Sequence, residues 1–531
     1  MPDTNNNLKR LLLLPIIVLL LAHSLVSTGA DDAPASNPYE SEWTPTAVGE
    51  IDRLVQQELS KRGIEAAMPA SEEVFFRRAY LDITGSIPPP QAFRKFRQVE
   101  PEIRRGALIE ALMETDAYKD YWTLKWSDLL RIKAEFPINL WPNGVQAYHR
   151  WVREAVAANM PYDEFVRKLL SSSGSNFRVP PVNFYRAIEG EKAETIASAV
   201  SLTLMGVRFD SWSSEQQADM ANIFSRVAYK KTDEWKEEIV YLDPARYSPL
   251  EITFPDGSKT AVVAGEDPRI AFADWLIQPD NPWFAGIIVN RAWFWLMGRG
   301  LIHEPDDIRD DNPAVNPALL AYLEKEFVGS GYDIKHIFRL ILNSRTWQQS
   351  SIPRSDDPEA EALFAHYVVR RLDAEVLYDA LRVLGGQGEI YQSPVPEPFT
   401  FVPEYNRTIE LADGSITSQF LEKFGRPSRD TGLELERDNE FSVEQSMYLL
   451  NSSEIQERIN ASQQLRDIGR LAKQNPRRSI AALYRLVLSR SPTGQELAYA
   501  ESYPGMLEGE KQAINDLCWA LINSKEFLFR H

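Results

Sequence analysis

The chain is poor in the side chains that bind soft metals or carry out thiol chemistry. Its 531 residues include one cysteine, Cys518, and six histidines. A haem attached through Cys-x-x-Cys-His, a zinc ribbon and a disulfide framework each need more cysteines than this sequence has, and a Cys–His nucleophile would have to use Cys518. Cys518 lies in the apolar stretch 514–522, which is typical of a buried helix and not of a reactive thiol. We therefore expect a protein without a cofactor, and the sequence alone assigns it no reaction.

Long hydrophobic runs are scarce as well. The apolar run Leu11–Ala22 follows two basic residues and leads into small residues that end at Ala30, which is the layout of a secretory signal. It is about a dozen residues long, whereas a membrane-spanning helix needs roughly 20. We therefore predict a cleaved signal peptide at residues 1–30, with an uncleaved membrane anchor as the alternative. No later segment is apolar enough to span a bilayer, so we expect an exported protein, periplasmic or at the cell surface, without a transmembrane helix after signal removal.

Positive charge is also in the minority. The chain has 58 Lys and Arg residues against 76 Asp and Glu residues, and its formal net charge is -18. A chain of this charge repels nucleic acid. We therefore expect no nucleic-acid partner.

Helix start and stop signals dominate the rest of the chain. Ser71 precedes two glutamates and an apolar run, which predicts a capped helix that ends at Gly85. Comparable helix starts occur at Pro161, Asn316, Asp333, Asp373, Ser442 and Thr493. These signals predict a mainly α fold.

Strand signals are confined to one stretch near the middle of the chain. The segments Glu251–Phe254 and Thr260–Val263 surround a Pro255–Gly257 turn, and Ile239–Leu242 precedes them, which predicts a small β-hairpin. The hairpin divides the chain into two helical units. The predicted organisation is a signal peptide at residues 1–30, a disordered linker at 31–44, an N-terminal helical domain at 45–230, a β-hairpin joint at 231–264 and a C-terminal helical domain at 265–531.

Several longer stretches carry a family resemblance. The clearest are Arg77–Gly85, Asn159–Val166, Asn290–Leu301 and the closing Asn523–His531. They resemble planctomycete-type exported proteins in which a cytochrome-associated, PSCyt-type domain precedes a PSD-type domain, both of unknown function. The resemblance implies that the N-terminal unit is PSCyt-type and the C-terminal unit PSD-type. Because such domains occur together with exported sulfatase-like or polysaccharide-processing proteins, the resemblance also implies a partner of this kind.

Two cysteine motifs of these relatives are missing. Where members of the family read Cys-x-x-Cys-His after Gly-Val-Arg, here Gly206–Arg208 runs directly into Phe209–Trp212. Where they often read Cys-x-Cys before Glu-Arg, here Leu433–Leu435 stands before Glu436. The joint loss predicts a branch without haem or metal, in which leucine keeps the buried volume of the lost thiols. Haem-linked electron transfer is therefore disfavoured.

An acidic loop is the first candidate site. Its oxygen-bearing side chains are Glu304, Asp306, Asp307, Asp310, Asp311 and Asn312. Such ligands suit a hard cation, and the four aspartates are the candidate calcium ligands, although the spacing is not that of an EF-hand. Turn formation and helix capping are the alternative interpretation.

A group of arginines is the second candidate site. Arg426, Arg429 and Arg437 alternate with acidic residues. Forked hydrogen bonds from these guanidinium groups could hold an acidic glycan, such as a sulfated or carboxylated sugar. A mutual salt-bridge network is the alternative.

Trp293 and Trp295 are the third candidate, as a stacking surface for a sugar. Side chains two residues apart point to different faces of a helix, so at most one of the two rings is free. Packing in the core is the alternative.

Catalytic motifs are weak. The sequence contains no Gly-x-Ser-x-Gly elbow, phosphate-binding glycine loop or His-Glu-x-x-His, and we assign no catalytic residue. We predict a binding or assembly component of the cell envelope. The alternative is a periplasmic hydrolase acting on a sulfated polysaccharide, with carboxylates from the 304–312 loop and aromatic residues near Trp293.

Overall fold

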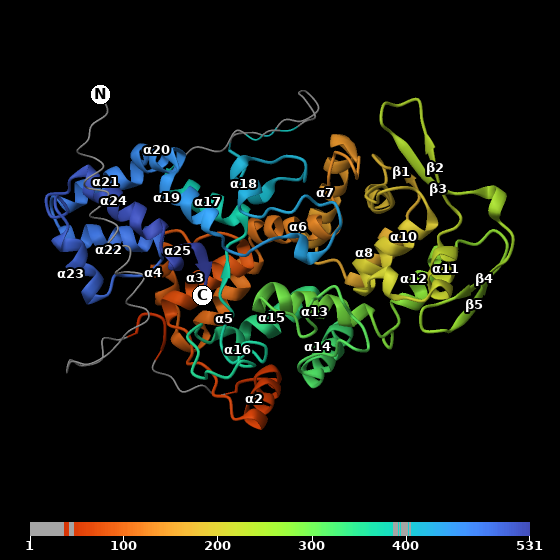
Figure 1. Ribbon diagram of the computed structural model, residues 1–531, viewed down its shortest axis with the longest axis horizontal. Coiled ribbons are helices and arrows are strands. Elements are labelled where there is room, and N and C mark those ends of the chain that lie inside the picture. Colours follow the sequence, from red (N-terminus) through yellow and green to blue (C-terminus); the bar gives the residue numbers. More distant parts are fainter. Residues whose placement is uncertain (1–36, 42–46, 386–390, 392, 394–401, 403–404) are drawn as a thin grey trace.

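The computed structural model describes residues 37–41, 47–385, 391, 393, 402 and 405–531. In these residues helices predominate, and small antiparallel sheets lie among them (Figure 1). The prediction of a mainly α fold is confirmed. The predicted signal peptide and most of the predicted linker lie outside the described residues. No helix within the described ranges is both long and apolar enough to cross a membrane.

The N-terminal half of the chain is a series of helices. They are α2 (Glu50–Arg62), α3 (Glu72–Thr84), α4 (Ala92–Gln98), α5 (Pro101–Met113), α6 (Asp116–Leu129), α7 (Trp141–Ala157), α8 (Tyr162–Ser171), α9 (Asn183–Arg186), α10 (Ala193–Val200) and α11 (Ser214–Ile223). Helix α6 packs against both α3 and α7, which places it in the middle of this half.

The strands of the middle segment form two of the sheets. Strands β1 (Gly174–Ser175), β2 (Val227–Lys231) and β3 (Glu238–Leu242) are ordered β1-β3-β2, and β4 (Leu250–Thr253) pairs with β5 (Lys259–Val262). The hairpin predicted around Pro255–Gly257 is present as β4–β5. The segment Ile239–Leu242 is not part of that hairpin: it pairs with β2, which begins at Val227, before the predicted joint.

The C-terminal half is again helical. Its helices are α12 (Pro268–Leu276), α13 (Phe284–Met297), α14 (Pro317–Gly329), α15 (Ile334–Asn343), α16 (Arg345–Gln348), α17 (Ala374–Gly385), α18 (Gln419–Lys423), α19 (Val443–Asn451), α20 (Ser453–Ala461), α21 (Gln463–Ala472), α22 (Pro476–Val487), α23 (Gly494–Ser502), α24 (Lys511–Ile522) and α25 (Lys525–Leu528). Strands β6 (Arg370–Arg371) and β7 (Phe529–Arg530) pair antiparallel. Cys518 of α24 is fully buried, as predicted.

Local side-chain chemistry explains where many of these helices begin. The Ser71 hydroxyl accepts the Val74 N–H at the start of α3, and Gly85 ends this helix in a left-handed conformation, φ 58°. The predicted capping boxes at Ser442 and Thr493 open α19 and α23. Helix boundaries of this kind are determined by a few neighbouring residues and can therefore be predicted from the sequence.

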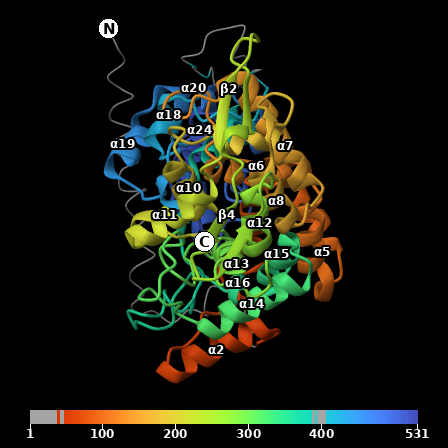
Figure 2. The same cartoon turned by 90° about the vertical axis from the view of Figure 1, so that its right-hand side faces the viewer.

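The two halves share one core and interlock. Helix α2, the first described helix, packs against α14 and α16, and Figures 1 and 2 both place it beside α14. The C-terminal strand β7 returns to the middle of the molecule near α3 (Figure 1), where Arg78 Nε donates to the His531 carbonyl at 2.9 Å. The predicted joint therefore separates the halves in sequence and not in space.

Residues 37–41 differ from our expectation of a disordered linker over 31–44. They are ordered: Ser71 N donates to the Tyr39 carbonyl at 3.0 Å, and the Tyr39 hydroxyl donates to Glu526 at 3.1 Å. The Tyr39 ring also makes an edge contact with His531. An aromatic residue with these partners gains enough contacts to offset the entropy of ordering the chain.

Candidate functional site

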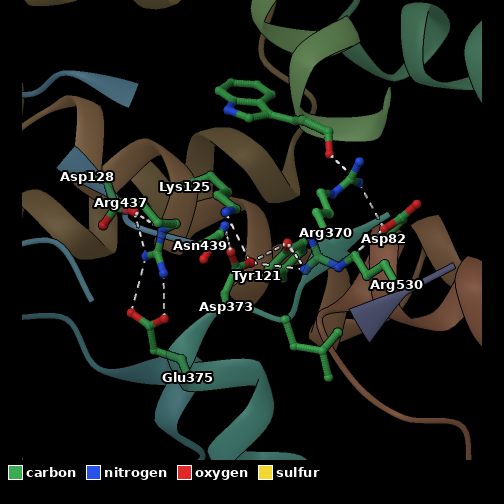
Figure 3. Close-up of polar contacts among 12 residues, drawn as sticks. Asp82, Tyr121, Lys125, Asp128, Arg370, Asp373, Glu375, Arg437, Asn439 and Arg530 are labelled. Carbon is green, nitrogen blue, oxygen red and sulfur yellow. Dashed lines mark hydrogen bonds and ion pairs between the residues drawn. The ribbon is translucent and has the colours of Figure 1, made fainter. Parts of the chain in front are cut away.

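A network of buried charges lies where the two halves meet, and Asp373 is at its centre (Figure 3). Asp373 accepts hydrogen bonds from the Tyr121 hydroxyl at 2.9 Å, from Arg530 Nη2 and the Asn439 amide at 3.0 Å, and lies 3.1 Å from Lys125 Nζ. Burial by itself raises the pKa of Asp373, but Lys125 and Arg530 outweigh it and hold the pKa well below its ordinary value. Asp373 is therefore an ionised carboxylate inside the core.

One face of α6 supplies the N-terminal side of this network. Tyr121, Lys125 and Asp128 are spaced by four and three residues, which places them on the same side of a helix. Asp82 of α3 adds a second carboxylate, 3.2 Å from Arg370 Nη2 of β6. Figure 3 shows these side chains converging from both halves of the chain. The network thus ties α3 and α6 to the C-terminal segments.

The three predicted arginines belong to the same network. Arg437 donates to Glu375 at 2.6 Å and to Asp128 at 2.7 Å; Arg429 Nε donates to Asp128 at 2.8 Å and Arg426 Nε to Glu375 at 3.2 Å. Their side chains are between 0% and 6% exposed. The structure brings the three arginines together, as predicted, in the salt-bridge arrangement that was our alternative to glycan binding. Their guanidinium groups face carboxylates of the protein and not solvent.

Trp293 and Trp295 are both inside the protein. Trp293 is 0% exposed and Trp295 7% exposed. We expected at most one of the two rings to be free to stack on a sugar, and neither ring is. Almost every residue of α13 is buried, and a helix surrounded on all sides has no face for solvent. Trp295 instead uses its polar atom: its Nε1 donates to Glu434 at 2.9 Å.

The four predicted calcium ligands do not converge on one point. Asp306 is buried and lies 2.6 Å from Arg291 Nη2. Asp307 and Asp311 both pair with Arg309, and Asp310 is exposed. In the part of the chain that the structure describes, no group of three or more His, Cys, Asp or Glu side chains is arranged to hold a metal ion. Arg291 and Arg309 pair with carboxylates of this loop.

Asp306 and Glu434 form a carboxyl pair that the sequence did not reveal. Asp306 accepts the backbone N–H of Glu434 at 2.7 Å across 128 residues of sequence. Burial first, and the nearby charge of Asp306 second, raise the pKa of Glu434 to about 7, against the opposing effect of Arg291. Glu434 therefore takes up and releases its proton near neutral pH, while Asp306 is paired with Arg291. Local sequence gives no signal for this pair because its members come from separate loops.

The two segments that depart from the resembled family meet around this pair. Arg291 donates to the carbonyl of Thr203 as well as to Asp306, and Gly206 accepts the N–H of Ile308 at 2.9 Å. One expectation was wrong: Leu435 is 46% exposed, so leucine does not keep a buried volume at that position. Leu435 is the middle residue of η6 (Glu434–Glu436), a single short helical turn, and its side chain points outward.

An open, charged cleft lies beside α6 and α7. It has a volume of about 390 Å³ and is lined by Asp116, Asp120, His149, Arg153, Arg407 and Glu410. Asp120 receives Arg153 Nε at 2.6 Å and also binds Arg407, and Arg407 Nε donates to Glu410 at 2.8 Å. The carboxylates hold both guanidinium groups in place, while Arg153 stays 38% and Arg407 32% exposed. The cleft therefore presents fixed, solvent-facing N–H groups.

His149 gives the cleft a neutral polar group. Burial, aided by Arg429 and Arg153, lowers the pKa of His149 to about 3. Among the described residues no donor or acceptor is bonded to its ring. A neutral imidazole that faces a cleft is available to a ligand. Sequence reasoning assigned His149 no role, because isolated histidines carry no spacing signal.

Comparison with family models gives the domain composition. A PSCyt2 model, described as a protein of unknown function (DUF1549), matches residues 50–229, and a PSD1 model, described as a protein of unknown function (DUF1553), matches residues 268–503. The chain carries a PSCyt2 domain and a PSD1 domain. The recognition made from the sequence is thereby confirmed. No curated protein and no solved structure matches the chain.

Both polar features lie on the boundary between PSCyt2 and PSD1. Helices α3, α6 and α7 belong to the PSCyt2 match, whereas Asp373, Arg407 and Arg437 belong to the PSD1 match. The buried network fixes one domain against the other, and the charged cleft opens at the same boundary. A ligand in the cleft would contact both domains at once.

Proposed function

We propose that this PSCyt2–PSD1 chain is a binding component of the cell envelope, and that the charged cleft is its ligand site. The observation that carries the proposal is the pair Arg153 and Arg407, which Asp120 holds side by side with N–H groups still exposed. Donors held in position before binding lose little entropy when a ligand arrives. The volume of about 390 Å³ suits a small ligand or one unit of a polymer.

The chemistry of the cleft fits a glycan. It combines carboxylate acceptors, guanidinium donors and a neutral imidazole, and sugar hydroxyl groups both donate and accept hydrogen bonds. A sulfate or carboxylate on the sugar would add a forked contact with an arginine. We therefore propose an acidic glycan as the ligand. Assembly with an exported sulfatase-like or polysaccharide-processing protein would place the bound glycan near an enzyme, and export through the N-terminal signal would bring the chain to it.

A glycan array tests this proposal directly. We expect the parent chain to retain sulfated or carboxylated glycans, and Arg153→Gln and Arg407→Gln to lose that retention without a large fall in Tm. Arg477→Gln is the matched control, because Arg477 is 72% exposed and pairs with Glu501 on α22–α23, outside the cleft. Equal retention by the parent and both cleft variants would refute glycan binding at this site.

One observation favours a second candidate function, hydrolysis of a polysaccharide. The pair combines Glu434, whose pKa of about 7 lets it give up a proton near neutral pH, with Asp306, a carboxylate group that is paired with Arg291; acid–base hydrolysis needs a proton-donating carboxyl beside a second carboxyl with a different role. A screen for reducing ends released from sulfated polysaccharides would detect the activity. Glu434→Gln should abolish it and Glu440→Gln, at an exposed position, should not; absence of release by the parent chain would exclude this candidate.

A further inference from the structure

Two tryptophans meet at the surface beside the start of α7. Trp235, in the turn between β2 and β3, is 53% exposed, whereas the other tryptophans that the structure describes are buried or half-buried. Trp141, the first residue of α7, meets it edge to face, with 4.9 Å between the ring centroids. Lys236 Nζ lies 4.3 Å from the centroid of the Trp141 ring. We call Trp141, Trp235 and Lys236 the aromatic platform.

Hydrogen bonds fix the turn that carries Trp235. The Glu237 carboxylate accepts the Ser175 hydroxyl at 2.5 Å and the Thr232 hydroxyl at 2.7 Å. The backbone N–H of Glu237 donates to the Glu234 carbonyl at 3.1 Å, which closes the turn. An exposed ring that is held in place before binding loses little entropy when a ligand packs against it.

The backbone is strained at two residues of the platform. Trp141 has a φ of 62° and Lys236 a φ of 63°. Residues with bulky side chains rarely adopt this left-handed conformation. Where they do, the surrounding structure imposes the strain, and such residues cluster at binding sites. Here the strain holds aromatic rings at the surface, which points to a ligand and not to core packing.

The aromatic platform and the charged cleft border the same helix and the same loop. Trp141 begins α7, and Arg153 of that helix lines the cleft, so roughly 18 Å along the helix axis separates them at 1.5 Å per residue. The segment that carries Arg407 continues to Asp413, which accepts the Ala134 N–H at 2.9 Å. The Ala134 carbonyl in turn accepts the N–H of Trp141 at 3.1 Å. One elongated ligand could therefore touch both places.

We propose that the aromatic platform is a second glycan subsite, where a sugar ring stacks on Trp235 and Lys236 donates to a sugar oxygen. The inference rests on the glycan binding proposed above for the charged cleft, and it makes the ligand a chain of several sugars, because one sugar unit cannot reach both places. The C–H groups on one face of a sugar ring pack well on an indole. Among the described residues no carboxylate pairs with Lys236, whose contacts are with the two rings, so its N–H groups are available to the sugar.

Fluorine NMR of the full chain, labelled with 5-fluorotryptophan, tests the platform directly. The resonance that is absent from Trp235→Phe belongs to Trp235. Hexasaccharides of chondroitin sulfate, heparin and carrageenan are titrated separately, and we expect at least one of them to shift this resonance to saturation. No shift by any of them would overturn the proposal. A shift caused by phospholipid vesicles and not by glycan would assign the surface to a membrane and would overturn it as well.

Affinities measured by calorimetry separate this inference from the proposal for the charged cleft. Trp235→Ala should bind the active hexasaccharide about fivefold or more weakly, because the stacking contact is lost, and should bind the matching disaccharide, which fits in the cleft alone, as the parent does. Arg407→Gln should weaken the binding of both. Tyr499→Ala is the control, because Tyr499 is also 53% exposed but lies on α23, and it should bind as the parent does.

The two proposals fail in different ways. Equal binding of the hexasaccharide by Trp235→Ala and by the parent would end this inference and leave the cleft as the glycan site. If Arg407→Gln keeps both the affinity and the shift of the Trp235 resonance, the cleft is refuted and the aromatic platform stands.

Discussion

Lys125 of the PSCyt2 domain and Asp373 of the PSD1 domain form an ion pair, with 3.1 Å between Nζ and Oδ2. The Asp373 side chain is 0% and the Lys125 side chain 11% exposed. Charges this deeply buried are tolerated only with good partners on both sides. The pair therefore makes the folding of each domain dependent on the other.

Removal of the Lys125 charge should destabilise the whole chain. Lys125→Met leaves Asp373 with Arg530 as its remaining cation, and we expect the free energy of unfolding to fall by about 3 kcal/mol in urea titrations. Addition of Asp373→Asn should restore part of this loss, because the stranded charge is then gone. Lys61→Met removes a lysine that is 57% exposed, and it should change stability by less than about 0.5 kcal/mol. Equal effects of Lys125→Met and Lys61→Met would contradict the prediction.

Because of Glu434, the free energy of unfolding should fall as the pH rises through neutrality. Its folded pKa of about 7 lies above the ordinary 4.5, so the folded state keeps a proton that the unfolded state releases. The stability from this protonation is complete below about pH 4.5 and is lost as pH rises through 7. Glu434→Gln retains an acceptor for Trp295 without ionising beside Asp306. We expect its Tm relative to the parent to increase from pH 5 to pH 8, and parallel Tm curves would disprove this.

His149 should act in the opposite direction. Its folded pKa of about 3 lies below the ordinary 6.5, so the unfolded state takes up a proton first as pH falls. The stability from the neutral ring is present above pH 6.5 and is lost as pH falls toward 3. His149→Gln should therefore lose less stability than the parent between pH 6.5 and 4. NMR titration of the ring is the direct check, and a midpoint near 6.5 would show that the imidazole is solvated.

Gly425 should be intolerant of any side chain. It has a positive φ of 73°, and a Cβ atom there would overlap the carbonyl oxygen of Asp438, which accepts Arg371 Nη2. We expect Gly425→Ala to lower the free energy of unfolding by about 3 kcal/mol or more. Gly257 has a similar φ of 83° with open space around it, so Gly257→Ala isolates the backbone cost of about 1–2 kcal/mol. If both variants lose the same amount, the contact with Asp438 is unimportant.

Local signals predicted much of the fold and little of the site. The helix starts at Ser71, Ser442 and Thr493 follow from hydrogen bonds within three residues. By contrast, Arg437 pairs with Asp128 across 309 residues, and spacing along the chain contains no trace of that contact. The acidic residues next to Arg437 in sequence suggested local neutralisation, but its main partners come from α6 and α17.

The sequence predicted the burial of one of the two tryptophans of α13 but not of both. Helical periodicity places Trp293 and Trp295 on different faces of α13, and a helix at the surface would expose one of them. Both are inside because other helices surround α13, and that enclosure is set by tertiary packing. The charged cleft escaped prediction for the same reason, since Asp120, His149 and Arg407 meet only after α6, α7 and the 407–410 turn have come together.

The position of Arg530 in the sequence has a consequence for synthesis. Strand β7 carries Arg530 to Asp373, Tyr121 and Asp82, so this part of the network is completed by a residue that lies 409 positions after Tyr121 in the sequence. The PSCyt2 segment emerges first and lacks the contacts of Arg530 until β7 has been synthesised. Such a chain matures in one late step, and until then it depends on whatever keeps nascent polypeptides from aggregating.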